Sequence, residues 1–467
     1  MDCNLLIDFG STYTKVLAID LDTESILGRA QSLTTVESNI LIGLQNALKI
    51  LFKEVPSIEE KKINKKIACS SAAGGLRMIA IGLVPVLTLE AARRAALGAG
   101  AKIVGSYANE LDDEAIQEIE EKPCDIIMLS GGTDGGNKEV ILHNARALAT
   151  LKKNVTVLVA GNRSVRSKVR EILLQAGKQV EVTENVMPEV NELNVEPARA
   201  VIRDIFMERI VKAKGLDGAQ EYVGDIVMPT PMASLRAAQL LADGTDEEPG
   251  LGDLLIVEIG GATTNIHSIG HGYPKDGHTV LKGLPEPYAK RTVEGDLGIR
   301  YNAHTIFEMA NHRLKDNLTN IDCLKDFLEV EKTTHEMGTN VGYVPQDDQS
   351  FRLDAALAKT AVQVAMERHA GHVREIPAMG ELLSVQYGKD LSDIKVVIGT
   401  GGVFHYGLYP ECILDGVTYE IQNPSSLKPK KPDFYIDKGY VLYGAGLLAA
   451  DSPTKALRIL KKNLQRI

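Results

Sequence analysis

Two stretches of the sequence place a single acid just ahead of a glycine- and hydroxyl-rich turn. Residues 4–19 read NLLIDFGSTYTKVLAI, and residues 254–269 read LLIVEIGGATTNIHSI. A carboxylate inside an apolar run is costly unless it has a charged partner, so Asp8 and Glu258 each need one. A hydrated Mg²⁺ is such a partner, because it prefers one or two carboxylates together with waters and phosphate oxygens. We therefore predict Asp8 and Glu258 as metal-side acids.

The turns that follow these acids have the composition of anion-binding sites. Small turn residues let backbone N–H groups converge on one point, and Ser or Thr hydroxyls add further donors. Lys15 adds a point charge suited to phosphate. The predicted phosphate-binding residues are Gly10, Ser11, Thr12, Tyr13, Thr14 and Lys15 in the first turn, and Gly260, Gly261, Ala262, Thr263 and Thr264 in the second. The alternative is a pair of ordinary hairpins with glycine turns. Because the pattern occurs in two matched copies, this interpretation is less favoured than it would be for a single hairpin.

A third glycine-rich segment follows a β-branched strand within residues 393–407. Such a turn allows a flat ring or a sugar to lie against bare backbone. The candidate residues in this turn are Gly399, Thr400, Gly401 and Gly402. Residues 439–450 then predict a helix with small residues on one face, which allows close packing against another element.

The elements that must position these turns are of two kinds. Each acid-bearing stretch is an apolar strand, a tight turn and a second apolar strand, which is the pattern of a β-hairpin. Between the two hairpins, residues 65–185 alternate strand-like and helix-like segments, which predicts βαβ units and a parallel sheet. Two Gly-rich turns in this block, 130–137 and 161–166, follow strands and precede helices. They are either a second anion site or tight turns capped by their own polar side chains.

Composition narrows the classes of partner. The 467 residues carry a net charge of −10, which gives no electrostatic basis for binding nucleic acid or an anionic membrane. The five cysteines are scattered and form no C-x-x-C pair, as is typical of reduced thiols in a cytoplasmic protein. No uninterrupted apolar run reaches the roughly 20 residues that a membrane-spanning helix needs. We expect a cytoplasmic protein of several domains.

The order of hairpin, hairpin, Gly-rich turn and small-residue helix resembles the actin/Hsp70/sugar-kinase superfamily. That resemblance implies an α/β fold, a two-lobed actin-like ATPase built of ribonuclease H-like repeats with an α/β domain inserted into the first lobe. The implied domains are the first lobe with the first phosphate hairpin (1–64), the inserted α/β domain (65–200), a return to the first lobe with a connecting helix (201–245), the second lobe with the second phosphate hairpin and the adenosine loop (246–436), and a C-terminal helical return to the first lobe (437–467).

Five motifs make the resemblance more specific. The stretches LIDFGSTYTKV, LSGGTDGGN, VEIGGATTNIHSIG, TVEGDLGIRYNA and VIGTGGVF look like those of the glutamate mutase accessory protein family, component L. This resemblance implies an ATP-dependent chaperone or reactivating factor for the adenosylcobalamin-dependent glutamate (methylaspartate) mutase. It implies ATP and Mg²⁺ as cofactors and the glutamate mutase subunits as partners. It also places Gly401 and Gly402 against the adenosine.

Two positions depart from the second phosphate loop that is usual in the superfamily. Glu258 stands where Asp is usual, and Asn265 stands where an acid is frequent. Glu258 can still reach a metal through water, but Asn265 cannot act as a base. We therefore expect slow hydrolysis, or nucleotide binding alone as the signal. The candidate catalytic residues are Glu258, Asp296 and Glu294; the last two would position the attacking water, or else cap the helix that follows them.

Two other functions and one decoy remain. A small-molecule kinase of the same superfamily would need an acid beside an acceptor pocket; Asp296 could serve, but GDLGIRYN contains no recognisable sugar-binding set. An actin-like scaffold protein is the other alternative. The segment NIHSIG (265–270) approaches the D-x-H-x-x-G pattern of cobalamin-binding domains, but Asn replaces Asp and His267 falls inside a hairpin strand. We expect no bound cobalamin and a structural role for His267.

Overall fold

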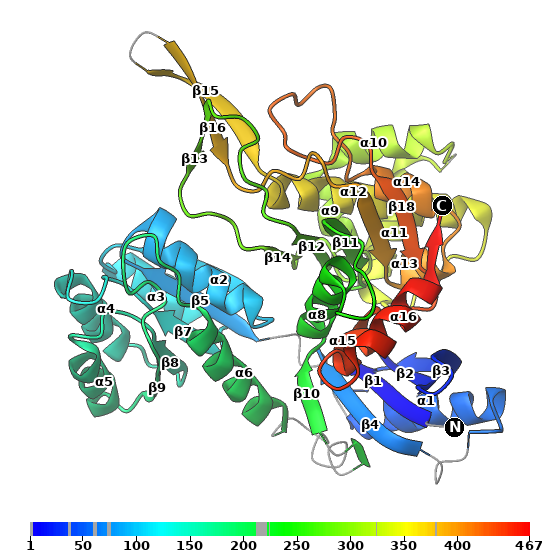
Figure 1. The fold of residues 1–467 in the computed structure, drawn as a ribbon, viewed down its shortest axis with the longest axis horizontal. Helices are drawn as coiled ribbons and strands as arrows, with labels where there is room; N and C mark the ends of the chain where they lie inside the picture. Colours follow the sequence, from blue (N-terminus) through cyan, green and yellow to red (C-terminus); the bar gives the residue numbers. More distant parts are fainter. Residues whose placement is uncertain are drawn as a thin grey trace. The chain divides into compact units, whose positions relative to one another are not determined.

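The computed structural model describes residues 3–35, 39–58, 63–71, 76–211, 222–223, 225–323, 325–378 and 381–467. The chain divides into two compact units (Figure 1). The first unit comprises Met1–Ala72 and Ala213–Ile467, and the second comprises Ala73–Lys212. Because the first unit is interrupted in sequence by the second, the second unit is an insertion.

The first sheet of the first unit contains the first acid-bearing hairpin. Its strands, in spatial order, are β10 (Asp225–Pro229), β4 (Ile63–Ser70), β1 (Cys3–Phe9), β2 (Tyr13–Asp20) and β3 (Ser25–Leu33). Strands β1, β2 and β3 are antiparallel neighbours, whereas β4 and β10 continue the sheet in parallel. Helix α1 (Ile40–Glu54) begins at the side-chain cap of Asn39 and packs on β2 and β3.

The second sheet repeats this arrangement around the second hairpin. Its strands, in spatial order, are β14 (Ala289–Glu294), β12 (Thr264–Ile269), β11 (Leu254–Ile259), β17 (Val396–Thr400), β18 (Asp433–Asp437) and β19 (Leu464–Arg466). Strands β14, β12 and β11 are antiparallel, and β17 and β18 follow in parallel, as β3, β2, β1, β4 and β10 do in the first sheet. The sequence repeat is thus a repeat of the fold, and the predicted fold class is confirmed.

Two helices, α8 (Thr230–Asp243) and α15 (Leu442–Leu448), lie between the two sheets. Helix α8 contacts strands of both sheets, and α15 contacts α8 and the first sheet. Small residues on α15 allow this packing. A Cβ on Gly446 would overlap the carbonyl oxygen of Ala233 on α8, and a Cβ on Gly444 would lie 2.9 Å from Leu6 Cδ1 on β1. One hydrophobic core joins these helices and α16 (Pro453–Asn463) to side chains of both sheets, including Leu6 and Ile256. The close packing predicted for residues 439–450 is found.

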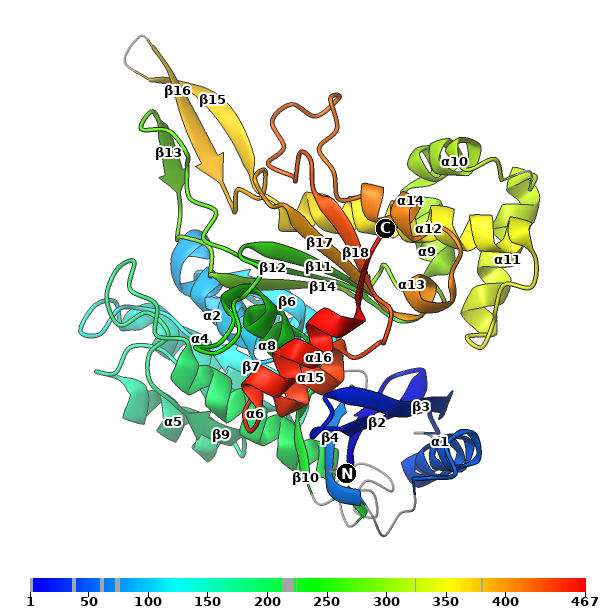
Figure 2. The ribbon, with the colours of Figure 1, turned by 45° about the vertical axis from the view of Figure 1, so that its right-hand side comes forward.

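The other face of the second sheet is covered by a second hydrophobic core. The helices of this part are α9 (Ala303–Met309), α10 (Asn311–Asn320), α11 (Phe327–Thr339), α12 (Asp348–His369), α13 (Gly402–Tyr406) and α14 (Pro410–Asp415). A separate sheet of β13 (Thr279–Lys282), β16 (Glu381–Tyr387) and β15 (His372–Ala378) projects from this part of the first unit (Figure 2). The sequence did not predict this projecting sheet.

The second unit is a parallel α/β domain. Its sheet has the order β6 (Lys102–Ala108), β5 (Arg77–Gly82), β7 (Ile126–Leu129), β8 (Thr156–Val159) and β9 (Gln179–Val182), with every neighbouring pair parallel. The helices are α2 (Glu90–Gly98), α3 (Asp113–Glu121), α4 (Glu139–Ala149), α5 (Arg166–Gln175) and α6 (Glu196–Val211), and a π-helical turn, Pro85–Leu89, precedes α2. The alternation of strands and helices agrees with the sequence analysis.

The edges of this unit differ from the predicted range 65–200. Strand β4 pairs with β1 and so belongs to the first sheet, although its apolar end reads like the start of the α/β block. Helix α6 packs on α2, within the second unit, and so carries the unit past residue 200. Both differences arise because pairing with a distant element, which local sequence does not encode, decides where each segment belongs.

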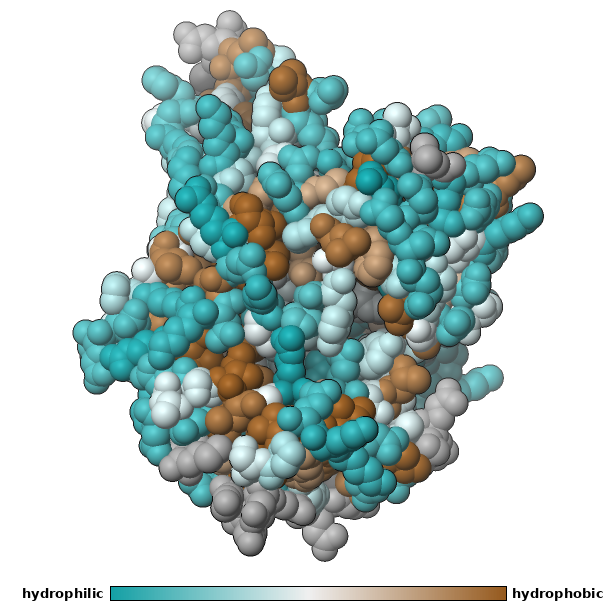
Figure 3. All heavy atoms as spheres, turned by 90° about the vertical axis from the view of Figure 1, so that its right-hand side faces the viewer, coloured by the Kyte–Doolittle hydropathy of each residue, from teal (hydrophilic) through white to brown (hydrophobic). Residues whose placement is uncertain are grey.

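One face of the molecule can be described by the hydropathy of its residues. The face shown in Figure 3 is mostly hydrophilic, with hydrophobic residues in small scattered groups. Within the described ranges, no helix is long and apolar enough to cross a lipid bilayer. The five cysteines are free thiols, and Cys3 and Cys69 are buried.

Candidate functional site

The first acid is held by two partners from different elements. Asp8 lies on β1 with 1% of its surface exposed, opposite Lys15 in the β1–β2 register. Lys15 Nζ donates to Asp8 Oδ2 at 2.9 Å, and Thr230 Oγ1, at the start of α8, donates to Asp8 Oδ1 at 2.6 Å. These bonds compensate the cost of a buried carboxylate and fix both of its oxygens.

Lys15 is a charged group that lies close to Tyr440. Its Nζ is 4.7 Å from the centre of the Tyr440 ring. Burial alone would lower the pKa of Lys15, but the charge of Asp8 and the hydroxyl of Tyr440 outweigh burial and raise the pKa well above its usual value. The ammonium is therefore permanent, as the predicted phosphate contact requires.

The second acid has an equivalent position in the second sheet. Glu258 lies on β11 opposite Asn265 in the β11–β12 register. Ser234 Oγ, on α8, donates to Glu258 Oε1 at 3.2 Å, while Asn265 Nδ2 at 3.2 Å and His267 Nε2 at 3.3 Å contact Oε2. Burial raises the pKa of Glu258, but the hydrogen bond from His267 and the nearby positive charges, including Lys15, outweigh it and lower the pKa. Glu258 is therefore ionised at neutral pH.

His267 supports Glu258 from beneath. It is fully buried, and burial lowers its pKa, so the ring is neutral and its Nε2–H donates to the carboxylate. Its Nδ1 atom and the Asn265 Oδ1 atom are buried without a hydrogen-bond partner among the described residues. His267 has the structural role that the sequence analysis expected, although its link to the second acid was not foreseen.

The two turns approach one another. Gly10 N donates to Tyr13 O at 3.1 Å in the first turn, and Gly260 N donates to Thr263 O at 2.9 Å in the second, so the turns have the same internal bond. A Cβ on Gly261 would lie 3.1 Å from Thr12 Oγ1.

Thr12 Oγ1 itself is buried and has no hydrogen-bond partner within the described ranges. A hydroxyl in that state is unusual, because buried polar atoms are nearly always paired. It lies where two Gly-rich turns meet, each with an acid behind it, and its unused O–H donor fits a phosphate oxygen, which accepts.

The third Gly-rich segment adjoins the second turn. Gly401 has φ +113°, a backbone conformation that favours glycine, and a Cβ there would overlap the carbonyl oxygen of Ile259 at the end of β11. Gly402 faces open space, since a Cβ there would meet no atom within 4 Å. Thr400 Oγ1 donates to Asp437 Oδ2 at 3.1 Å, and Gly399 packs against the Phe404 ring, so these two residues support the segment from within.

Two of the predicted catalytic acids are engaged by an arginine. Arg368, on α12, donates to both oxygens of Asp296 at 2.8 and 2.9 Å, and to Glu294 Oε2 at 2.6 Å. The hydrogen bonds to Asp296 are the first cause of a raised pKa for Arg368. Because one guanidinium binds both carboxylates, neither Asp296 nor Glu294 is an unpaired base in this structure.

Helix α8 supplies site residues that the sequence analysis missed. Thr230 and Ser234 each donate to one of the acids, whereas the sequence predicted only a connecting helix within 201–245 and no site residue on it. Pro231 near the helix N-terminus, with two hydroxyls four residues apart, is the signal that would have found them.

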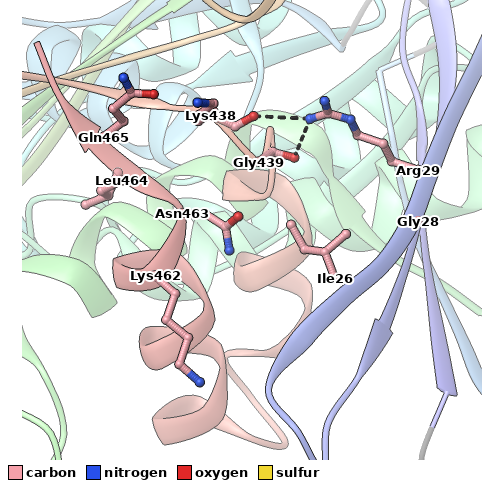
Figure 4. Close-up of a pocket in the computed structure, with 9 residues that line it drawn as sticks. All are labelled: Ile26, Gly28, Arg29, Lys438, Gly439, Lys462, Asn463, Leu464 and Gln465. Carbon is pink, nitrogen blue, oxygen red and sulfur yellow. Dashed lines mark hydrogen bonds between the residues drawn. The ribbon is translucent and has the colours of Figure 1, made fainter.

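A pocket of about 430 Å³ is lined by residues of β3, of the segment after β18, and of the end of α16 with β19 (Figure 4). None of the predicted site residues lines it. Arg29 Nη1 donates at 3.1 Å to the carbonyl oxygens of both Lys438 and Gly439, which joins the first sheet to the turn after β18. Tyr440 follows this turn with φ +54°, a costly conformation for a bulky residue, and its ring faces Lys15.

The Gly-rich turns of the second unit are bonded to one another. Asn162 Oδ1 accepts from the backbone N–H groups of Gly135 and Ser164, and Asn162 Nδ2 donates to the carbonyls of Gly136 and Asn137. These bonds favour tight turns that are capped by their own side chains over a second anion site.

Both oxygens of Asp8 and of Glu258 already accept hydrogen bonds, so this pair of acids fits a divalent cation that is held through its waters. Among the described residues, no group of three or more His, Cys, Asp or Glu side chains is placed to hold a metal ion. Two carboxylates that act through water are what Mg²⁺ commonly uses, with phosphate oxygens completing its shell.

Comparison with known proteins gives the family. A family model described as MutL protein matches residues 4–464. Protein MutL of Clostridium tetanomorphum is 48% identical over 469 residues, covering 100% of both chains. Among solved structures, the activator of the 2-hydroxyisocaproyl-CoA dehydratase from Clostridium difficile matches 100% of this chain and 99% of that one, with 9% identity and a TM-score of 0.32. Xylulose kinase from Bifidobacterium adolescentis matches 98% of this chain and 93% of that one, with 12% identity and a TM-score of 0.31. The chain therefore belongs to the MutL protein family, the glutamate mutase accessory proteins that its motifs resemble.

Proposed function

We propose that this protein is an ATP-binding chaperone or reactivating factor for the adenosylcobalamin-dependent glutamate mutase. One observation carries the nucleotide part of the proposal: the turns at Thr12 and Gly261, from two separate sheets, lie against each other with an acid behind each. Membership of the MutL protein family supports the choice of partner.

In this proposal the phosphates bind where the two turns meet. Backbone N–H groups of the turns, the hydroxyls of Thr12 and Thr263 and the ammonium of Lys15 bind the phosphate oxygens. Asp8 and Glu258 hold the waters of Mg²⁺, which neutralises phosphate charge when bound. The open face of Gly402 receives the adenosine.

Hydrolysis, in this proposal, is slow. Glu258 is ionised and the pKa of its His267 partner is lowered, so one acid is available to orient a water molecule. Asp296 and Glu294 are weaker candidates than Glu258 for orienting this water. Each accepts a charge-assisted hydrogen bond from Arg368, which would have to break before the acid could act as a base. The same pairing weighs against the kinase alternative, which needs an unpaired acid beside the acceptor.

We further propose that the nucleotide state controls the grip on the mutase. A ligand that binds both turns favours the arrangement in which they lie together, and by linkage a partner that prefers that arrangement binds more tightly. The inserted second unit is the proposed partner-facing part, and the protein is proposed to act in the cytoplasm.

The test is a reactivation assay. Glutamate mutase that has been inactivated by turnover is incubated with this protein, adenosylcobalamin and either ATP, ADP or no nucleotide. We expect recovery of mutase activity only with ATP, and co-precipitation of mutase subunits that depends on the nucleotide. Recovery without nucleotide, or none with ATP although ATP binds, would contradict the proposal. A variant lacking Ala73–Lys212 should still bind ATP but no longer co-precipitate the mutase.

A further inference from the structure

One face of helix α8 contacts the acids of both sheets. Thr230 Oγ1 donates to Asp8 of the first sheet at 2.6 Å, and Ser234 Oγ donates to Glu258 of the second sheet at 3.2 Å. Residues i and i+4 lie on the same helix face, about one turn or roughly 5–6 Å apart. A single helix turn therefore spans the distance between the hydroxyls that hold the two acids.

Helix α8 is itself firmly placed. Ala233, between the two hydroxyl residues, touches Gly446 of α15 so closely that no larger residue fits there. Ala237, Ala238 and Leu241 are fully buried in the core that includes side chains of both sheets. Protein interiors are close-packed, so a shift of α8 along its axis would disturb this core. The spacing of the two hydroxyls is thus a fixed feature of the fold.

Each acid is oriented from two sides. One oxygen of Asp8 accepts from Thr230 and the other from Lys15, while one oxygen of Glu258 accepts from Ser234 and the other from its own hairpin. An ionised carboxylate has about four acceptor positions. Three donors contact each acid, with Cys69 Sγ as the third on Asp8 and His267 Nε2 as the third on Glu258, so each acid keeps about one position for a water of a metal ion. Partners of this kind fix ligand orientation, and removing one typically costs 10–100-fold in metal affinity.

We propose that Thr230 and Ser234 are positioning residues that hold Asp8 and Glu258 in one orientation and at one separation, so that both sheets share the water shell of one divalent cation. This inference rests on the proposed nucleotide site. In this inference, helix α8 as well as the two turns keeps the acids of the two sheets at a fixed separation. Loss of either hydroxyl then weakens the binding of the cation. The affinity for the metal-free nucleotide, which the turns bind, is unaffected.

The experiment is a Mg²⁺ titration by calorimetry at a saturating concentration of a non-hydrolysable ATP analogue, using the full chain. Thr230→Val and Ser234→Ala should each raise the Mg²⁺ concentration at half-saturation by about tenfold or more. The affinity for the metal-free analogue in EDTA should stay within about twofold, a fold-change worth less than 1 kcal/mol. Thr230→Ser, which keeps the hydroxyl, should restore the wild-type Mg²⁺ midpoint.

Thr454→Val is the control for loss of a bonded threonine hydroxyl, because that hydroxyl is bonded at 3.2 Å to another hydroxyl, Thr245 Oγ1, and to neither acid. It should leave the Mg²⁺ midpoint unchanged. The double variant Thr230→Val/Ser234→Ala should lose less than the product of the single losses, since both act through one cation.

The outcomes separate the two levels of the account. A wild-type protein that binds no ATP analogue would overturn the proposed function and this inference with it. A wild-type protein that binds, with unchanged Mg²⁺ midpoints in folded Thr230→Val and Ser234→Ala variants, would overturn the positioning role alone. An equal loss of affinity for the metal-free analogue would also overturn it, because that would indicate a general packing effect.

Discussion

The hydroxyl of Thr12 faces Gly261 so closely that a Cβ on that glycine would lie 3.1 Å from the Thr12 Oγ1 atom. The two residues belong to turns of different sheets and are far apart in sequence. This contact brings together the two matched stretches in which an acid precedes a Gly-rich turn.

Gly261→Val should weaken binding of Mg·ATP by about tenfold or more, equivalent to at least 1.4 kcal/mol. The added side chain would push against Thr12 Oγ1 and against Arg300, whose Cβ would lie 3.5 Å from the new Cβ, so the turns could not keep their distance. Calorimetric titration with Mg·ATP measures the change. Gly277→Val is the control, because a Cβ at Gly277 meets nothing within 4 Å. Equal affinity of the Gly261→Val protein would show that the turns do not share a ligand.

Glu258→Gln and Asp296→Asn should differ strongly in ATP hydrolysis. Glu258 is ionised and held by hydroxyl, amide and imidazole donors, so its neutral substitute should slow hydrolysis by about 100-fold, in the range of general acid–base effects. Asp296 is engaged by Arg368, so its neutral substitute should change the rate by less than about threefold. Single-turnover assays of phosphate release would compare them. A larger loss in Asp296→Asn would transfer the water-positioning role to Asp296.

Acid should destabilise the protein through His369. This residue is fully buried, contacts Ser268 Oγ at 2.8 Å and Thr292 Oγ1 at 2.9 Å, and faces the charges of Lys290 and Lys389. Burial first, and then these lysines, hold its pKa well below the usual value. Below about pH 6.5 the unfolded chain binds a proton at this histidine that the folded chain does not. The free energy of unfolding therefore decreases as the pH is lowered, by up to about 1.4 kcal/mol per pH unit for this group.

The check is the free energy of unfolding in urea at pH 7.5 and 5.5. His369→Gln should reduce the loss of stability between these values, because glutamine does not titrate. His312→Gln, at an exposed histidine on α10, should leave the loss as it is in the wild type. An unaltered pH dependence in His369→Gln would assign the acid sensitivity to other groups, including His267.

Local patterns made much of the fold predictable, and long-range contacts account for what was missed. The sequence predicted the hairpins at Asp8 and Glu258 and the α/β alternation of the second unit, because a pattern of consecutive residues specifies each of them. Strand β4 was assigned to the wrong side of a boundary because its partner, β1, lies far away in sequence.

The site followed the same division. The turn residues were recognisable from composition, whereas Thr230 and Ser234 become site residues only through the packing of α8 beneath both sheets. Arg368 lies 72 positions after Asp296 in the sequence, so no local pattern could show that this acid is paired with an arginine. Arg29 was missed for the same reason, because it binds backbone carbonyls, which leave no mark in the sequence.

Arg29→Ala should loosen the turn after β18. Its guanidinium binds the Lys438 and Gly439 carbonyls, and the next residue, Tyr440, faces Lys15. We expect faster amide hydrogen exchange at Tyr440 and faster dissociation of Mg·ATP, by several-fold. Lys438→Ala is the matched control, since only the backbone of Lys438 takes part in the bond. Exchange at Tyr440 that is the same in both variants would contradict a role for Arg29 in holding this turn.

The central claim is that two turns from separate sheets, with Asp8 and Glu258 behind them, bind one magnesium-bound nucleotide. Calorimetric titration of ATP into the wild-type protein, with Mg²⁺ and with EDTA, tests it most directly when repeated on Asp8→Ala and on the exposed control Asp246→Ala. The account predicts one site in the wild type and in Asp246→Ala, with affinity that rises when Mg²⁺ is present, and loss of that rise in Asp8→Ala. No binding to the wild type, or an undiminished Mg²⁺ effect in Asp8→Ala, would contradict it.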